Sequence, residues 1–253
     1  MLNSISHLNG SKVTATDGDI GTVKEVFFDD RNWAIRYLVV DAGNWLDDRL
    51  VLLSPYALMQ PMGSDKHVHV ALTRQQVMNS PNVDAHQPVS RQHEREMMSY
   101  YQYPEYWDGT DLWGSGDRPS LPVMAVGADD NRVTPLQSNQ AKEVHLRSSA
   151  HVTGYEIQAV DDSIGQVQDF IFDDESWAIR YLVVDTSSWW SLKRKVLIGM
   201  HWAAHLDWAS RKFHVNLTRE QVKSSPEYED VSSIHREYEV RLHQNYQRNG
   251  YWV

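Results

Sequence analysis

Residues 33–41 read Trp-Ala-Ile-Arg-Tyr-Leu-Val-Val-Asp, and the same nine residues return unaltered at positions 177–185. In an extended strand, successive side chains point to opposite faces, so Ile35 and Val39 share one face while Leu38 lies on the other. Both faces are therefore apolar. A strand of this kind belongs in a closed sheet, and the unaltered repeat predicts that the chain contains one module twice.

One polar residue interrupts the second face in each copy, Arg36 in the first and Arg180 in the second. A long aliphatic stem can pack on apolar surface while the charged end stays in water. We therefore expect each arginine to lie along its barrel with the guanidinium at the rim.

Bulk properties limit the class of protein. A chain of 253 residues is long enough for two domains of ordinary size. The formal net charge of -10 disfavours nucleic acid as a partner, and the lack of cysteine excludes disulfides and thiol chemistry. The sequence shows neither a signal peptide nor an apolar run of about 18 residues. We expect a soluble, cytoplasmic protein, while peripheral association with a membrane stays open.

Local patterns predict the rest of each module. Alternating apolar residues indicate strands, and Val23, out of phase with Val26, indicates a bulge in the second strand. Thr73 to Gln76 and Thr218 to Gln221 fit capping boxes that begin short helices. In the first copy we expect strands at residues 12–16, 20–28, 33–41, 49–53 and 67–72, with a tight turn at residues 17–19.

The repeat offset changes once along the module. Trp33 and Trp177 are 144 residues apart, whereas Val51 and Val196 are 145 apart. A one-residue shift inside a strand would turn its side chains to the wrong face. The extra residue is therefore expected in the loop before Val196.

A second matched piece follows each barrel. Tyr106-Trp107 returns as Tyr251-Trp252, and each piece carries an apolar stripe typical of an amphipathic helix that docks on a barrel. The stripes are Val89, His93, Met97 and Tyr100 in the first copy and Val231, Ile234, Tyr238 and Leu242 in the second. Glycines and prolines mark a linker between the copies, part of which is expected to lie against a domain. The predicted divisions are a first barrel with its tail (1–107), a linker (108–149) and a second barrel with its tail (150–253).

The repeat resembles the PRC-barrel domain, a small β-barrel family. The resemblance rests on the opening turn and glycine (17–21 and 161–165), the following Val-x-(Asp/Glu)-hydrophobic strand, the Tyr-Leu-Val-Val-Asp strand and the Val-Leu-Leu/Ile strand. All four pieces occur in the same order in both copies. We therefore expect a mainly β protein of two tandem small barrels, each with a short helix and a helical tail.

The resemblance implies modest functions. Related domains occur in the photosynthetic reaction centre H subunit, where they are associated with electron and proton transfer to quinone, and in a ribosome maturation factor that holds a ribosomal protein. The chain lacks the membrane helix of the first and the separate amino-terminal domain of the second. A non-enzymatic scaffold that binds proteins is the leading hypothesis. An accessory role in membrane electron transfer and a metal-binding or enzymatic role are the alternatives.

Polar residues with possible chemistry have structural explanations. Asp29-Asp30 and Asp173-Asp174 stand at turns, and Asp41 and Asp185 end strands where a carboxylate can accept bonds from loop amides. The pairs His67/His69 and His201/His205 have the spacing of metal ligands, but neither pair occurs in both copies. We predict no catalytic, cofactor or metal site.

Tryptophans and charges gather at the variable loop of each copy. Such loops are typical of binding hot spots, and opposite charges would favour docking between the barrels or between copies in a dimer. Packing against a tail helix or the sister barrel is the alternative. The residues of this predicted partner-binding loop are Trp45, Asp47 and Asp48 in the first copy and Trp189, Trp190, Lys193, Arg194 and Lys195 in the second.

Overall fold

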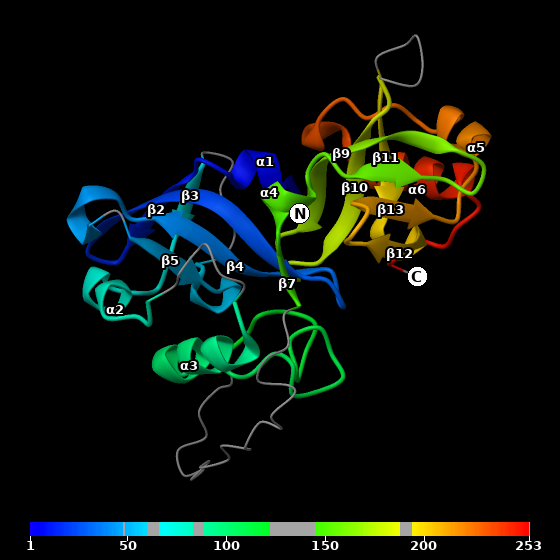
Figure 1. Cartoon of the computed structure of the whole chain (residues 1–253). Helices are drawn as coiled ribbons and strands as arrows, with labels where there is room; N and C mark the ends of the chain where they lie inside the picture. Colours follow the sequence, from blue (N-terminus) through cyan, green and yellow to red (C-terminus); the bar gives the residue numbers. More distant parts are fainter. Residues whose placement is uncertain (48, 60–65, 83–88, 122–144, 188–193, 253) are drawn as a thin grey trace. The chain divides into compact units, whose positions relative to one another are not determined.

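A computed structural model describes residues 1–253 except 48, 60–65, 83–88, 122–144, 188–193 and 253. The chain divides into two compact units. Unit 1 contains residues 1–8, 149–174 and 178–253, and unit 2 contains residues 9–148 and 175–177. Both units are dominated by β-sheet, which confirms the predicted fold class (Figure 1).

The described part of unit 2 holds a six-stranded sheet with the order β5-β4-β3-β2-β6 and with β7 paired to β3. The register of β3 against β4 shifts between Val23 and Glu25, which confirms the predicted bulge. Its strands are β2 (Lys12–Ala15), β3 (Gly18–Asp29), β4 (Ala34–Asp41), β5 (Leu50–Leu53), β6 (His67–His69) and β7 (Leu146–Ser148).

The described part of unit 1 holds a seven-stranded sheet with the order β11-β10-β9-β8-β13-β12 and with β1 paired to β9. Its strands are β1 (Leu2–Ser4), β8 (Glu156–Gln158), β9 (Ser163–Asp173), β10 (Ile179–Asp185), β11 (Lys195–Gly199), β12 (Ala203–Asp207) and β13 (Lys212–Val215). Within the described residues, no ladder joins the two end strands of either sheet. The sheets are therefore not the continuously closed sheets that the sequence predicted, because the chain leaves β5 and β11 for turns of 3-10 helix, η2 (Pro55–Ala57) and η4 (Met200–Trp202). After these turns, Leu58 bridges Val70 in unit 2, and β12 pairs with β13 in unit 1.

The units do not coincide with the sequence repeats, because each takes a short strand from the other repeat. β1 precedes the first repeat but pairs with β9 through Leu2 and Asp173. β7 precedes the second repeat but pairs with β3 through Leu146 and Asp29. Residues 175–177 also belong to unit 2, where the Ile35 amide donates to the Trp177 carbonyl (2.8 Å).

The repeated strand lies at the centre of each core. Every β4 residue from Ala34 to Val40 is buried, as expected for a strand that is apolar on both faces. Trp177 is completely buried, whereas Trp33 is half-buried and stacks on Phe28 with a centroid distance of 5.5 Å. The two tryptophans at equivalent positions of the repeat therefore differ in environment.

Helices begin where the capping signals predict. Thr73 and Thr218 each form a complete capping box before α2 (Arg74–Met78) and α5 (Arg219–Lys223). The tails contain α3 (Arg91–Tyr101) and α6 (Arg236–Asn245), and short helices α1 (Ile5–Leu8) and α4 (Ser149–Val152) follow β1 and β7. In the described residues, no helix has both the length and the apolar character that crossing a membrane demands.

The buried faces of the tails differ from the predicted stripes. In α3 the buried residues are Arg91, Glu94, Met97 and Met98, and Tyr100 is exposed. In α6 they are Tyr238, Glu239, Leu242 and His243, while Val231 lies before the helix in η5 (Val231–Ser233). Four residues of the predicted stripes are buried, Val89, Met97, Tyr238 and Leu242. The stripes left out the charged residues that each helix buries in ion pairs.

Candidate functional site

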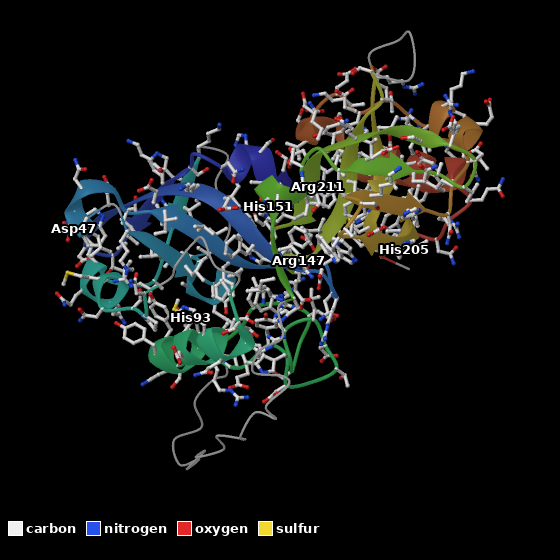
Figure 2. All side chains as sticks on the ribbon, in the orientation of Figure 1. Asp47, His93, Arg147, His151, His205 and Arg211 are labelled. Carbon is white, nitrogen blue, oxygen red and sulfur yellow. The ribbon has the colours of Figure 1, made fainter. Side chains whose placement is uncertain are left out.

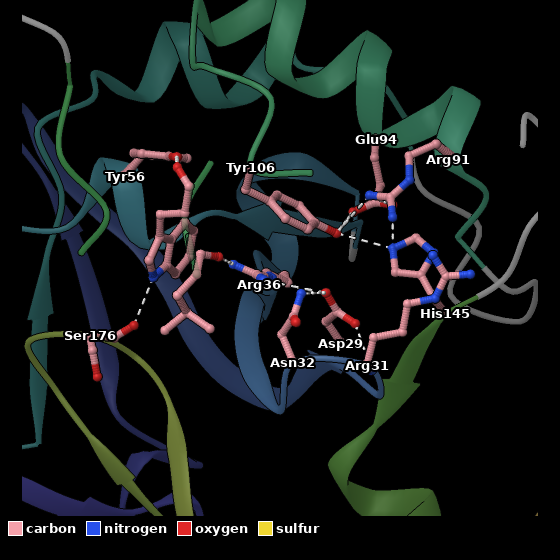
Figure 3. A network of polar contacts seen from close by, with 12 residues as sticks. Asp29, Arg31, Asn32, Arg36, Tyr56, Arg91, Glu94, Tyr106, His145 and Ser176 are labelled. Carbon is pink, nitrogen blue, oxygen red and sulfur yellow. Dashed lines mark hydrogen bonds and ion pairs between the residues drawn. The ribbon is translucent and has the colours of Figure 1, made fainter. Parts of the chain in front are cut away.

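A cluster of four polar side chains lies buried beneath α3 in unit 2 (Figure 3). This first polar cluster consists of Arg91, Glu94, Tyr106 and His145. The Glu94 carboxylate is fully buried, 3.2 Å from the Arg91 guanidinium and 3.0 Å from Nε2 of His145, and it also accepts the Tyr106 hydroxyl. His145 stands just before β7, so the cluster ties the tail helix to a strand from the other repeat.

Arg36 extends this cluster toward the sheet. Its guanidinium carbon lies 3.9 Å from the centroid of the Tyr106 ring and 4.6 Å from that of Trp113. One Arg36 nitrogen donates to the Leu112 carbonyl (2.8 Å) and another lies 3.3 Å from the Asp29 carboxylate. The expected rim position is therefore wrong for Arg36, whose side chain is 0% exposed because residues that follow the tail helix cover it.

Unit 1 contains an equivalent second polar cluster, formed by Tyr181, Arg236, Glu239, His243 and Tyr251. Glu239 accepts the hydroxyls of Tyr181 (2.8 Å) and Tyr251 (2.9 Å). The Arg236 guanidinium lies 3.1 Å from the Glu239 carboxylate. His243 differs in origin from His145, because it comes from the tail helix itself.

Burial controls protonation in both clusters. It raises the pKa of Tyr106 well above 10.0, and the Glu94 charge raises it further. It likewise raises the pKa of Tyr181, with Glu239 as the next cause. Burial lowers the pKa of His243 below 6.5. The two phenols are therefore protonated and able to donate, and the His243 ring is neutral at pH 7, with Nδ1 2.9 Å from the Asn249 carbonyl.

The chemistry of the first polar cluster is that of a structural tie. A general acid or base must come within hydrogen-bond distance of its substrate. Glu94 is 0% exposed and His145 is 2% exposed. Each already contacts polar groups of the protein, including the other. Together these contacts hold α3 and the segment before β7 on the sheet of unit 2.

Sequence analysis missed both clusters, although a signal was present. Arg91 and Glu94 recur as Arg236 and Glu239 at a constant offset of 145, the same offset that relates Tyr106 to Tyr251. The predicted stripes begin instead at Val89 and Val231, which are 142 residues apart. Because the tails were aligned by their apolar residues, the repeat of the charged residues Arg91 and Glu94 was not recognised.

In the first copy, the predicted partner-binding loop is partly held by its own unit. The indole nitrogen of Trp45 donates to the Ile20 carbonyl, and the Arg74 guanidinium lies 4.5 Å from the Trp45 ring centroid. Asp47 ends η1 (Gly43–Leu46) in the left-handed conformation, and its side chain is exposed (Figure 2). Asp48 lies outside the described residues.

In the second copy, Arg194 donates to the carbonyls of Lys223 (3.0 Å) and Ser225, and so fastens the loop to the end of α5. Lys195 begins β11 opposite Asp185. Trp189, Trp190 and Lys193 lie outside the described residues, so the partner-binding role of the loop stays a prediction.

The other candidates occupy structural positions. The carboxylate of Asp29 accepts from the Arg31 amide, and those of Asp41 and Asp185 accept from the amides of Gly43 (3.0 Å) and Ser187 (2.8 Å), as predicted. His205 stacks on His214 with a centroid distance of 4.2 Å. Across the part of the chain that is described, no three His, Cys, Asp or Glu side chains gather where they could hold a metal ion.

Comparison with known proteins agrees with this architecture. The family model of the PRC-barrel domain matches residues 2–71 and 148–222. Because these two matches cover more than half of the sequence, the chain belongs to the PRC-barrel domain family and contains the domain twice. None of the curated proteins compared with the chain matches it. The first match combines β1 with the first repeat, although β1 pairs with β9.

Proposed function

We propose that the chain is a non-enzymatic scaffold whose two PRC-barrel units bind segments of other proteins. Tandem domains of this family are consistent with a binding role. The observation that carries the proposal is a peptide segment held on unit 2. Residues 108–121, here called the cover segment, follow the first tail, and Trp113 of this segment is 2% exposed.

Side chains of the barrel hold the cover segment through contacts that suit a peptide ligand. Arg36 donates to the Leu112 carbonyl (2.8 Å), and the Tyr56 hydroxyl donates to the Trp113 carbonyl (3.4 Å). The Tyr56 ring meets the Trp113 ring edge to face at 5.1 Å. Backbone carbonyl recognition combined with an aromatic anchor is typical of segments that bind at protein interfaces.

Affinity capture with the full-length chain tests the proposal. The tagged chain is incubated with an extract of its source cells, and retained proteins are quantified with and without an excess of untagged chain. We expect at least one protein to be retained in near-stoichiometric amount and displaced by the untagged chain. Retention of no protein above background contradicts the proposal.

A second bait tests the predicted loop. The W189A/W190A variant removes both loop tryptophans of the second copy. Loss of the captured protein would assign binding to the loop, and unaltered capture would exclude these tryptophans from it. The wild-type bait is the control.

A further inference from the structure

The surface of unit 2 that holds the cover segment has a counterpart in unit 1. At the constant repeat offsets, Arg36 corresponds to Arg180 and Tyr106 to Tyr251. The Arg180 guanidinium carbon lies 4.2 Å from the Tyr251 ring centroid, close to the 3.9 Å of the first pair. The Arg180 guanidinium also lies 3.4 Å from the Asp173 carboxylate. The corresponding distance from Arg36 to Asp29 is 3.3 Å. The binding platform is therefore built in both units.

The two platforms differ in exposure. The Arg36 side chain is 0% exposed, whereas that of Arg180 is 25% exposed. Tyr56 is buried, but His201 at the corresponding position is exposed. Tyr251 is half-buried, whereas Tyr106, its counterpart in unit 2, is 2% exposed. The platform of unit 1 therefore has surface available to a ligand where that of unit 2 is covered.

The two platforms also differ in charge. Tyr103, whose ring lies 5.4 Å from Tyr56, is replaced by Arg248 in the second repeat. Arg248 is exposed and acts electrostatically on His201, as does Arg180. A guanidinium in place of a phenol favours an acidic ligand. The cover segment is itself acidic, with three aspartates against one arginine in residues 108–121.

We infer that the platform of unit 1, formed by Arg180, His201, Arg248 and Tyr251, binds an acidic, tryptophan-containing segment of a partner protein. Arg180 donates to a backbone carbonyl of that segment, and the tryptophan lies against Arg180 and His201, as Trp113 lies against Arg36 and Tyr56. This inference rests on the proposed scaffold function and specifies its ligand.

A synthetic peptide with the sequence of residues 108–121 is the probe, labelled with fluorescein and titrated with the full-length chain. We expect saturable, one-to-one binding measured by fluorescence anisotropy. A peptide with Trp113→Ala should bind at least tenfold more weakly. Absence of saturable binding by the wild-type peptide overturns the inference.

Variants of the chain locate the binding site. R180A and H201A should each weaken binding at least tenfold. His201 is an exposed residue of η4 whose ring lies 5.4 Å from that of Trp202 and takes no part in the ion pair between Arg180 and Asp173, so H201A keeps the test valid if R180A does not fold. The matched control is R219A, which removes another partly exposed arginine of unit 1, 35% exposed and 2.8 Å from Asp162. Equal affinity of wild type, R180A and H201A overturns the inference, because the peptide would then bind elsewhere.

The test separates this inference from the proposed function. If the peptide does not bind but the full chain still captures a displaceable protein from the extract, the scaffold function stands and the ligand assignment is wrong. If capture also fails, both are wrong.

Discussion

At the residue scale, the first polar cluster depends on Glu94. The E94Q variant removes the negative charge that faces Arg91, whose side chain is only 7% exposed. Removing one partner of a buried ion pair costs about 3–5 kcal/mol, because the other charge stays buried without compensation. We expect a loss of this size in the free energy of unfolding, measured by urea denaturation.

The second polar cluster supplies the matched control. In E239Q the affected cation is Arg236, whose side chain is 55% exposed and can be hydrated. The loss should therefore be smaller than in E94Q. Equal losses in the two variants would show that the burial of the arginine does not set the cost.

The histidines of unit 1 make its stability depend on pH. Burial lowers the pKa of His243 below 6.5, so the unfolded state binds the proton more tightly than the folded state. The contribution is fully present above pH 6.5 and is lost as the pH falls through that value toward the folded-state pKa. We expect the free energy of unfolding to decrease between pH 7 and pH 5, measured by urea titrations at each pH.

The first repeat indicates the variant that removes this dependence. Met98 occupies the position that corresponds to His243, so H243M introduces a residue that the sister helix already buries. The decrease in stability between pH 7 and pH 5 should be smaller in H243M than in wild type. An unaltered slope would assign the dependence to other groups, of which His201, with a pKa also lowered by burial, is the first to test.

At the scale of elements, the contact between β3 and β4 requires a glycine. A Cβ atom at Gly21 would lie 1.9 Å from the Asp41 carbonyl oxygen. At the equivalent contact between β9 and β10, a Cβ atom at Gly165 would lie 2.2 Å from the Asp185 carbonyl oxygen. G21A must therefore push the two strands apart, and overpacking of this kind costs about 1–3 kcal/mol. G116A is the control, because nothing lies within 4 Å of its added Cβ. Thermal unfolding should show a lower Tm for G21A alone, and equal Tm values would contradict the predicted clash.

The elements that the sequence predicted are those with local signals. Strands β2 to β6 and the helices after Thr73 and Thr218 follow from alternation, turn residues and capping. The interrupted sheet edges were not predicted, and neither was the burial of the charged faces of α3 and α6. The ion pairs of these helices are local, but the residues that bury them, such as His145 and Tyr181, are distant in the sequence. Glu94 shows the limit, since nothing near it in the chain indicates that His145 lies 3.0 Å away.

At the scale of the whole molecule, the main feature missed by sequence analysis is the exchange of short strands. β1 and β7 have three residues each, too few to show a hydrophobic period, and their neighbours in the chain belong to the other unit. Duplication explains how the exchange arises, because the two repeats offer strands of similar sequence, β3 and β9, to either short strand. Each unit therefore depends, for the pairing at that position of β3 or β9, on a strand from outside its own repeat.

This dependence predicts that a change in β1 affects the second repeat. Asn3 pairs with Phe172, and Arg147 at the equivalent position of β7 pairs with Phe28. Proline has no backbone N–H and disrupts a ladder, so N3P should increase amide hydrogen exchange in β9 and leave β3 protected. R147P should do the reverse, and the two variants serve as controls for each other in exchange experiments read by mass spectrometry. If N3P instead increased amide hydrogen exchange in β3, β1 would pair within its own repeat. The pairing of β1 with β9 would then be wrong.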